Sequence, residues 1–200
     1  MYYFLLILLA LLNNSAYANK VSFPDSHAPI SVMADHTHKK NEIMLSYRFM
    51  NMNMNKLYYG NNEISINETM STPNGASNGS GTYMNAPTLM NMDMHMLGFM
   101  FAPTDSITLM LMNSYNQKEM TQQRMAGAGG SKFDVNSSGF GDVKLSALLS
   151  TNDNRDWKNH IAFGLSFPTG SIDVRDRTPV SNSSRLGYNM QNGTGTYDSY

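Results

Sequence analysis

Hydrophobic and polar residues alternate with a two-residue period along much of this chain, and little of it shows the period of a helix. Such alternation predicts β-strands whose side chains point to opposite faces of a sheet. The predicted strands cover residues 41–55, 87–101, 106–116, 139–150 and 157–168, and a sixth begins near Gly193. They exceed the roughly 5–6 residues of ordinary strands and suit the roughly 9–11 that cross a bilayer at a tilt.

The connections between these strands alternate in length. Residues 56–86, 117–138 and 169–192 form long polar loops, whereas 102–105 and 151–156 are short turns. This order is typical of transmembrane barrels, whose outer loops are long and whose periplasmic turns are short. The sequence therefore predicts an all-β fold, an antiparallel up-and-down transmembrane β-barrel. About six strands are fewer than the eight of the smallest single-chain barrels, so the barrel is expected to be an incomplete, N-terminal portion or to close by assembly of several chains.

In four of the strands, one face is apolar and the other is polar or rich in Met. Around residue 163, for example, Ile161, Phe163 and Leu165 alternate with His160 and Gly164. The apolar face is expected to meet lipid, with Tyr47, Trp157, Phe163 and Phe167 near the membrane interfaces. The other face is expected to line the lumen, where the charged or titratable residues are Arg48, Asp142, Lys144, Lys158 and His160. They form either a constriction that sorts solutes or a structural network of ion pairs.

The strand 87–101 does not follow this rule. Its alternate positions from Met90 to Met100 are mostly Met, and the opposite positions include both Asp93 and Phe99. Asp93 should avoid lipid, whereas Phe99 should seek it. Either the Met face points outward here, or a bulge at Gly98 exchanges the two faces along the strand.

The first 18 residues have the pattern of a secretory signal peptide. An apolar run from Phe4 to Leu12 is followed by a polar break and the small-residue site Ala16-Tyr17-Ala18. Residues 19–40 are expected to form an extended periplasmic lead-in, and 41–200 a single β-barrel domain. The expected location is the cell outer membrane, with its lipid as the partner.

Composition excludes several classes of function. The formal net charge is −1 and only 14% of residues are charged, which argues against nucleic-acid binding through a basic surface. Without Cys, neither a disulfide scaffold nor a Cys-ligated metal site exists. The sequence also lacks the local signatures of hydrolases, nucleotide-binding loops and dinucleotide-binding folds, so we do not expect an enzyme.

The chain has 18 Met, many of them spaced two residues apart. Thioethers are soft ligands that favour Cu(I), and imidazoles can join them; the candidate metal ligands are His36, His38, Met50, Met52, Met54, Met92, Met94, His95 and Met96. The simpler interpretation, which we favour, is that Met fills space on an irregular apolar surface. His36 and His38 form an HxH pair that could bind a divalent metal. Two imidazoles are too few ligands to identify a specific metal site.

Four blocks, in order along the chain, resemble a family of bacterial outer-membrane β-barrels described as transporter-like or as phenol-degradation (MetA-pathway) proteins; they are residues 35–54, 90–103, 138–148 and 189–197. Asn41 departs from the Gly expected before the first strand. The resemblance implies a barrel without catalytic residues. Together with the pattern, it predicts passive passage of small solutes, hydrophobic or aromatic ones among them. The alternative is a periplasmic Met/His-rich β protein that binds or relays copper.

Overall fold

The computed structural model describes residues 32–74, 81–153 and 158–200. The predicted signal peptide, most of the lead-in and Trp157 lie outside these residues. The elements below all belong to one compact unit, His36–Tyr200. No helix among the described residues is long and apolar enough to cross a membrane.

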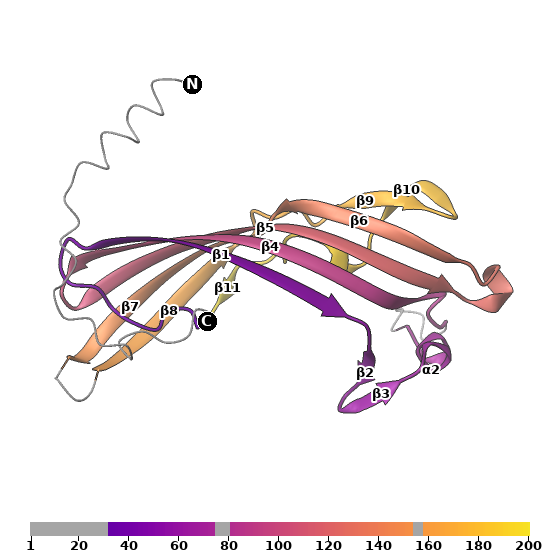
Figure 1. The fold of residues 1–200 in the computed structure, drawn as a ribbon, viewed down its shortest axis with the longest axis horizontal. Helices are drawn as coiled ribbons and strands as arrows, with labels where there is room; N and C mark the ends of the chain where they lie inside the picture. The colour runs from indigo at the N-terminus through magenta and orange to yellow at the C-terminus, as the bar shows by residue number, and fades with distance from the viewer. Residues whose placement is uncertain (1–31, 75–80, 154–157) are drawn as a thin grey trace, which may run out of the picture. The chain divides into compact units, whose positions relative to one another are not determined.

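An antiparallel sheet of seven strands forms most of this unit (Figure 1). Its order is β1-β4-β5-β7-β8-β11, and β6 pairs with the remaining part of β5. The strands are β1 (Ile43–Met54), β4 (Asn85–Thr104), β5 (Ile107–Arg124), β6 (Lys132–Phe140), β7 (Val143–Asp153), β8 (Lys158–Phe167) and β11 (Asp198–Ser199). The all-β antiparallel class predicted from sequence is therefore confirmed, and the described strands form an open sheet that begins at β1 and ends at β11.

The segment 117–138 is not the loop that was predicted. β5 continues to Arg124 and turns through the short helix η1 (Ala126–Ala128) into β6. β5 pairs first with β6 and then with β7. Phe140, at the end of β6, pairs with Tyr115, and Lys144 of β7 pairs with Met112. Three residues on one strand thus lie opposite two on the other, which is a one-residue bulge at Gly141–Asp142.

Smaller elements occupy the two other segments that were predicted as loops. Between β1 and β4 lie a hairpin, β2 (Leu57–Tyr59) with β3 (Asn62–Ile64), and the helix α2 (Ile66–Ser71). Ser65 and Glu68 form a capping box at the start of α2. The backbone N–H of Ser65, with its side chain, holds the pKa of the Glu68 carboxyl below its usual value. After β8 come the hairpin β9 (Arg175–Thr178) and β10 (Ser181–Arg185) and the short helix η2 (Tyr188–Met190).

The pairing of β1 with β4 decides how the second predicted strand is oriented. Its register runs without a shift from Ile43 opposite Phe101 to Met54 opposite Met90. The bulge at Gly98, one of the two alternatives that the sequence left open, is therefore absent. Gly98 lies opposite Ser46, whose Oγ would be 2.6 Å from an added Cβ. All Met positions of β4 thus share a face with the Met positions of β1.

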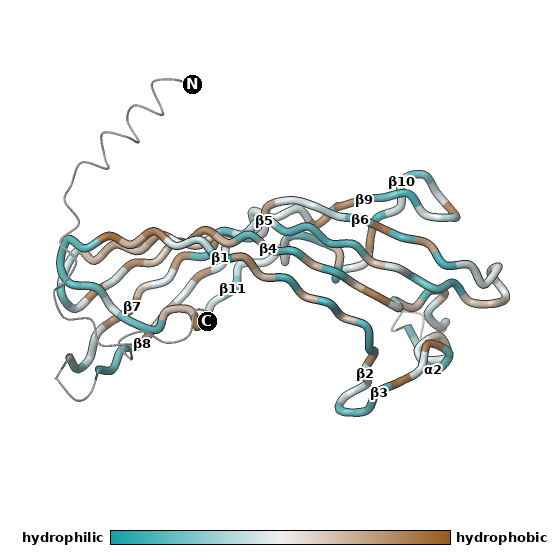
Figure 2. Tube along the Cα trace, in the orientation of Figure 1, coloured by the Kyte–Doolittle hydropathy of each residue, from teal (hydrophilic) through white to brown (hydrophobic). Residues whose placement is uncertain are grey.

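Hydrophobic residues are frequent along one half of the long strands (Figure 2), and on one face of the sheet, here called the exposed face, they form an apolar surface. Leu45, opposite Phe99, is 76% exposed. Neighbouring strands continue this apolar band through two rows of cross-strand partners, which are Ile43–Phe101–Leu109–Ala147–Phe163 and Leu45–Phe99–Leu111–Leu145–Leu165. Because the residues of each row are direct neighbours across the sheet, the band is continuous from β1 to β8.

The exposed face changes character further along the strands. An aromatic row crosses the sheet first: Phe49, His95, Tyr115 and Phe140 are partners on β1, β4, β5 and β6. Polar rows follow on the same strands, and the first consists of Asn51, Asp93, Gln117 and Ser138. Asp93 and Phe99 therefore share a face without conflict, because the strand is longer than the apolar band.

The opposite face, here called the covered face, carries most of the buried side chains. Met100 is 3% exposed, and Thr108 and Leu148 are fully buried. Segments from both ends of the compact unit contact this face. His38 donates its backbone N–H to Thr108 Oγ1 (2.9 Å), and Leu186 and Met190 pack with Met120 in one buried cluster.

A tight backbone contact fixes the segment that follows β8, and a glycine substitution tests it. A Cβ on Gly193 would overlap the carbonyl of Gly170, which is backbone and cannot rotate away. We expect Gly193→Ala to lower the free energy of unfolding by about 1–3 kcal/mol, as overpacking does elsewhere. Gly127→Ala is the control, since an added Cβ there meets nothing within 4 Å. Equal unfolding curves for the two variants, followed by circular dichroism in denaturant, would contradict this contact.

Candidate functional site

The covered face of β1, β4 and β5 carries twelve of the 18 Met in the chain. They are Met44, Met50, Met52 and Met54 on β1, Met90, Met92, Met94, Met96 and Met100 on β4, and Met110, Met112 and Met120 on β5. Two-residue spacing along each strand and unbroken register between β1 and β4 bring them together. The sequence predicted the spacing, and the register adds the neighbours across the strands.

Within β1, β4 and β5, Met is confined to this face. On the exposed face of the same three strands the apolar residues are Ile, Leu, Phe, Tyr and Pro, with no Met among them. The covered face has no Leu, Ile, Val or Phe on these strands, and its remaining positions are Gly, Ala or polar. If the strands needed only apolar side chains, Met and the aliphatic or aromatic residues would be mixed on both faces. The covered face is therefore chemically distinct: flexible, polarisable and lined with sulfur.

Three consecutive pairs of Met face each other across β1 and β4. Met50 is the partner of Met94, Met52 of Met92, and Met54 of Met90. Directly opposite residues have Cβ atoms about 4.5–5.5 Å apart. The predicted ligands Met50, Met52, Met54, Met92 and Met94 are thus brought into one patch, and Met96 continues it opposite Arg48.

His95 does not join these thioethers. It points to the exposed face, where the hydroxyl of Tyr47 lies 2.7 Å from its Nδ1 and the Phe49 ring centroid lies 5.1 Å from its own. Neighbouring positions of a strand face opposite sides, so His95 and Met94 cannot share an ion on this sheet. The structure thus corrects the predicted grouping of His95 with Met92, Met94 and Met96.

His36 and His38 lie together at the other end of the covered face. Their ring centroids are 4.8 Å apart, edge to face, and His38 Nδ1 is 3.5 Å from a carboxylate oxygen of Glu42. His38 is tied to Thr108, whereas the pair Met50–Met94 continues on β5 at Asn116. Eight residues of strand separate these levels, which is about 27 Å. The two His are therefore not part of the Met patch.

The charged residues predicted for the lumen all lie on or beside the covered face, but they do not gather. Arg48 is on β1 and Lys144 on β7, three strands away, or about 14 Å. His160 and Lys158 pair with Ser150 and Asp153, near the end of β7 and the beginning of β8. Lys144 lies 5.9 Å from the centre of the Tyr200 ring, whose hydroxyl is 2.8 Å from Ser146 Oγ.

The carboxylate of Asp142 binds backbone groups of the segment after β8 and does not face an open lumen. It accepts the backbone N–H of Gly170 (2.9 Å) and both the N–H and the hydroxyl of Thr194 (2.8 Å each). The bulge at Gly141–Asp142 turns the carboxylate toward these donors. Asp142 therefore fastens the segment after β8 to the sheet, a role that its position in the sequence did not indicate.

The segment 186–192 packs against the covered face beside the Met patch. Lys118 donates from Nζ to the carbonyls of Asn189 (3.0 Å) and Gln191 (2.6 Å), and the Asn189 amide donates to the sulfur of Met120 (3.4 Å). The buried Gln191 side chain bonds the backbone of both Val174 and Leu186. Sequence reasoning missed these residues. The pair Leu186 and Met190, apolar and four apart in a polar stretch, was the only available signal.

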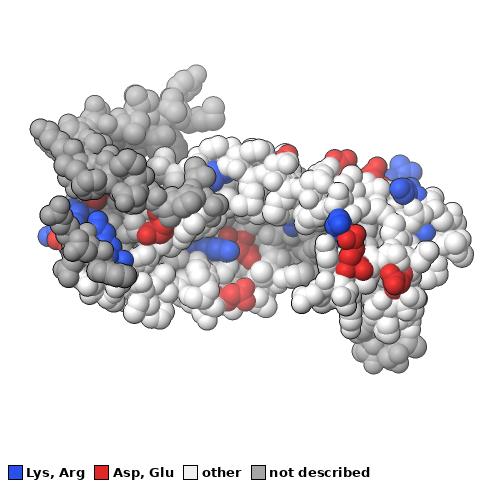
Figure 3. All heavy atoms as spheres, turned by 60° about the horizontal axis from the view of Figure 1, so that its bottom comes forward, with Lys and Arg blue, Asp and Glu red and all other residues white. Residues whose placement is uncertain are grey.

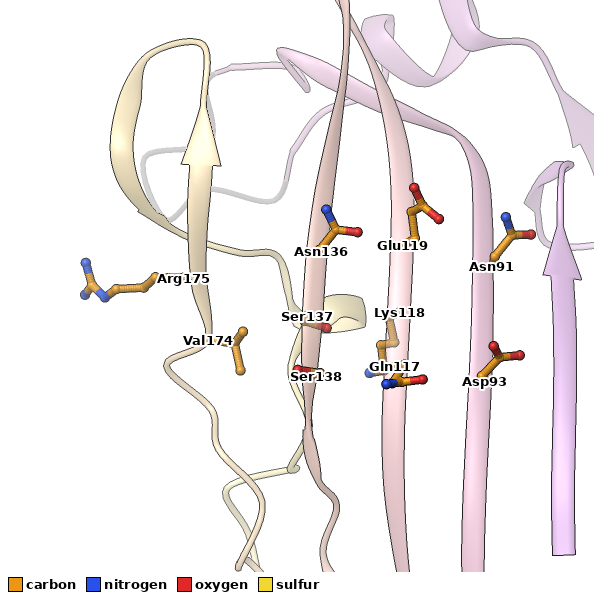
Figure 4. A pocket seen from close by; sticks show the side chains of 10 residues that line it. All are labelled: Asn91, Asp93, Gln117, Lys118, Glu119, Asn136, Ser137, Ser138, Val174 and Arg175. Atoms are coloured by element: carbon orange, nitrogen blue, oxygen red, sulfur yellow. The ribbon is translucent and has the colours of Figure 1, made fainter.

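A depression of about 550 Å³ lies beyond the aromatic row, lined mostly by polar residues of the exposed face and also by Lys118, Ser137, Val174 and Arg175 (Figure 4). Asn91 and Asp93 of β4 stand beside Glu119 and Gln117 of β5, with Asn136 on β6. The amide of Asn51 donates to Asp93 (2.6 Å), which links the row to β1. This surface is amphipathic along the strands: apolar, then aromatic, then hydrophilic.

Charge is sparse on the molecule. On the face seen in Figure 3, Lys, Arg, Asp and Glu form small separate groups on a largely uncharged surface. Within the described residues, no three His, Cys, Asp or Glu side chains gather as a metal site. The soft donors of the covered face are therefore its most distinctive chemistry.

The Asp142 contacts give a testable expectation. Asp142→Ala leaves the N–H groups of Gly170 and Thr194 without their acceptor, and the free energy of unfolding should fall by about 1–2 kcal/mol. Proteolysis in the segment 168–197 should also become faster. The control is Asp173→Ala in the same segment, where the exposed carboxylate pairs with the exposed Arg175 and Arg185. Unchanged protease resistance in Asp142→Ala would show that the carboxylate does not hold this segment.

Comparison with known proteins assigns no family to the chain. No family model matches it, and no curated protein or solved structure gives a significant match. The likeness of the four sequence blocks to outer-membrane barrels therefore stays an expectation. Function has to be inferred from the two faces of the sheet and from what each can contact.

Proposed function

We propose that this sheet is part of the wall of an outer-membrane β-barrel, through which small apolar or aromatic solutes pass without catalysis. The exposed face meets lipid, and the covered face lines the passage. The observation that carries this proposal is the continuous apolar band on the exposed face. A soluble sheet would cover such a surface, because a large apolar patch in water invites association.

The dimensions of the band suit a bilayer. On β5 it runs from Ile107 to the aromatic Tyr115, close to the roughly 9–11 residues that a tilted strand needs to cross. The row Phe49–His95–Tyr115–Phe140 matches the aromatic belt that transmembrane barrels place at the interface. The polar rows beyond it, and the β5–β6 hairpin that carries them, then stand in water outside the cell.

The covered face supports passage of apolar solutes. Met side chains have three rotatable bonds and adapt to ligands of varied shape. Ser46, Ser114 and Asn116 lie among them and supply uncharged hydrogen-bonding groups. A wall with few charges and flexible thioethers presents little barrier to small aromatic molecules.

A lipid-facing sheet also needs its edges paired. β1 pairs with β4 on one side only among the described strands, and β11 pairs with β8 over two residues. Unpaired backbone groups in hydrocarbon are costly, so the wall is proposed to close with further strands, either of a longer chain or of other copies. Export through the leader at residues 1–18 belongs to the same proposal.

Single cysteines test which face meets lipid, and the chain has no native Cys to interfere. Leu45→Cys and Phe163→Cys, on the apolar band, should react in membranes with a lipid-soluble maleimide and resist a charged one. Met44→Cys and Ser114→Cys on the covered face, and Gln117→Cys beyond the aromatic row, should be protected from lipid. Rapid labelling of Leu45→Cys by the charged reagent in intact membranes would refute the lipid-facing assignment.

Passage itself is tested in liposomes that contain the purified full chain. We expect faster entry of a neutral phenol-sized solute than of a charged one of equal size, above the rate of empty vesicles. Replacing Met96 with Arg puts a second guanidinium directly opposite Arg48 and should slow the neutral solute severalfold. The control Leu97→Ile on the exposed face should leave the rate unchanged. Equal rates with and without the protein would reject the channel.

A further inference from the structure

We infer that four thioethers, those of Met50, Met52, Met92 and Met94, form a binding site for a soft monovalent cation, Cu(I) or Ag(I). The juxtaposition is a rectangle on the covered face: Met50 lies opposite Met94, and Met52 opposite Met92. This site does not depend on closure of a barrel, because all four ligands come from one hairpin-like pair of strands.

The spacing allows the sulfurs to converge. Residues two apart on a strand are about 6.6–6.8 Å apart, and direct cross-strand partners have Cβ atoms about 4.5–5.5 Å apart. A Met side chain extends its sulfur two bonds beyond Cβ and rotates freely, so four of them can meet over the centre of the rectangle. Soft sulfur ligands select Cu(I) and similar ions over hard cations.

The surroundings favour this set over the other Met of the face. Met90 and Met120 are packed into the buried cluster with Val135, Leu186 and Met190. Met50, Met52 and Met94 are only partly buried, so an ion can reach them, whereas Met92 is 8% exposed and removes one side of the site from water. The chain has no Cys to compete for the ion.

Nearby positive charge disfavours a divalent ion at this site more strongly than a monovalent one. Lys118 is the partner of Met92 on the far strand, and its ammonium is held by the carbonyls of Asn189 and Gln191. Arg48 lies two residues from Met50 on the same face. Four neutral thioethers beside these cations supply no negative charge to balance a divalent ion. The same patch should therefore exclude Zn²⁺ and Ca²⁺.

Titration of the full chain in detergent tests the site. Silver nitrate in chloride-free buffer, followed by calorimetry, and Cu(I) kept reduced in competition with a chelator should both show binding, whereas Zn²⁺ and Ca²⁺ should not. Substituting all four residues with Leu keeps their volume, which usually costs little stability. It should raise the dissociation constant for Ag(I) at least tenfold.

The matched control changes four Met that lie outside β1, β4 and β5, which are Met33, Met70, Met84 and Met125, to Leu. It should bind within twofold of the unchanged protein. Circular dichroism identifies any variant that fails to fold, in which case the pair Met50→Leu and Met94→Leu is measured instead. No Ag(I) binding by the unchanged chain, or an equal loss in the control, would overturn the site. Neither result would alter solute passage, which the liposome rates measure separately.

Discussion

The side-chain alternation of β1, β4 and β5, held in unbroken register, is the constraint on which the other features depend. A shift of one residue between β1 and β4 would move every Met of one strand to the opposite side and expose its Leu and Phe partners to the wrong environment. The register runs without a break from Ile43 to Met54. The separation of sulfur-bearing from aliphatic and aromatic side chains follows directly from it.

A second division runs along the strands rather than across them. β5 begins in the apolar band, passes the aromatic row at Tyr115, and ends among Gln and Thr. The same strand therefore contacts three kinds of surroundings in succession. The covered side of β5 also changes along its length. Near its start Thr108 contacts His38, and near its end Lys118 and Met120 contact Asn189. The surroundings of both faces of the sheet therefore change along the length of β5.

Sequence alone predicted the features that depend on local alternation. The apolar face through Ile161, Phe163 and Leu165 and the shared Met face of the first strand are both as expected, because each repeats every two residues. The hairpin of β5 and β6 was missed, since beyond Tyr115 the exposed face is polar and β5 has only Met120 as an apolar residue on the covered face, so the alternation in hydropathy is weak. Which face of β4 carries its Met residues could be decided only from its register with β1. Contacts such as Lys118 with Asn189 join residues 71 positions apart and leave no local signal.

The order of strands in the sheet has a consequence for how the molecule assembles. Among β1, β4, β5, β7 and β8, neighbours in the sheet follow one another in this order along the chain, and the entropic cost of closing even the long connection between β1 and β4 rises only slowly with its length. The segments that cover the Met face come from far away in sequence: His38 reaches Thr108 across 70 positions and Gln191 reaches Lys118 across 73. Local contacts form faster than distant ones. We therefore expect the sulfur-lined face to be covered after the strands have paired, by segments from both ends of the compact unit.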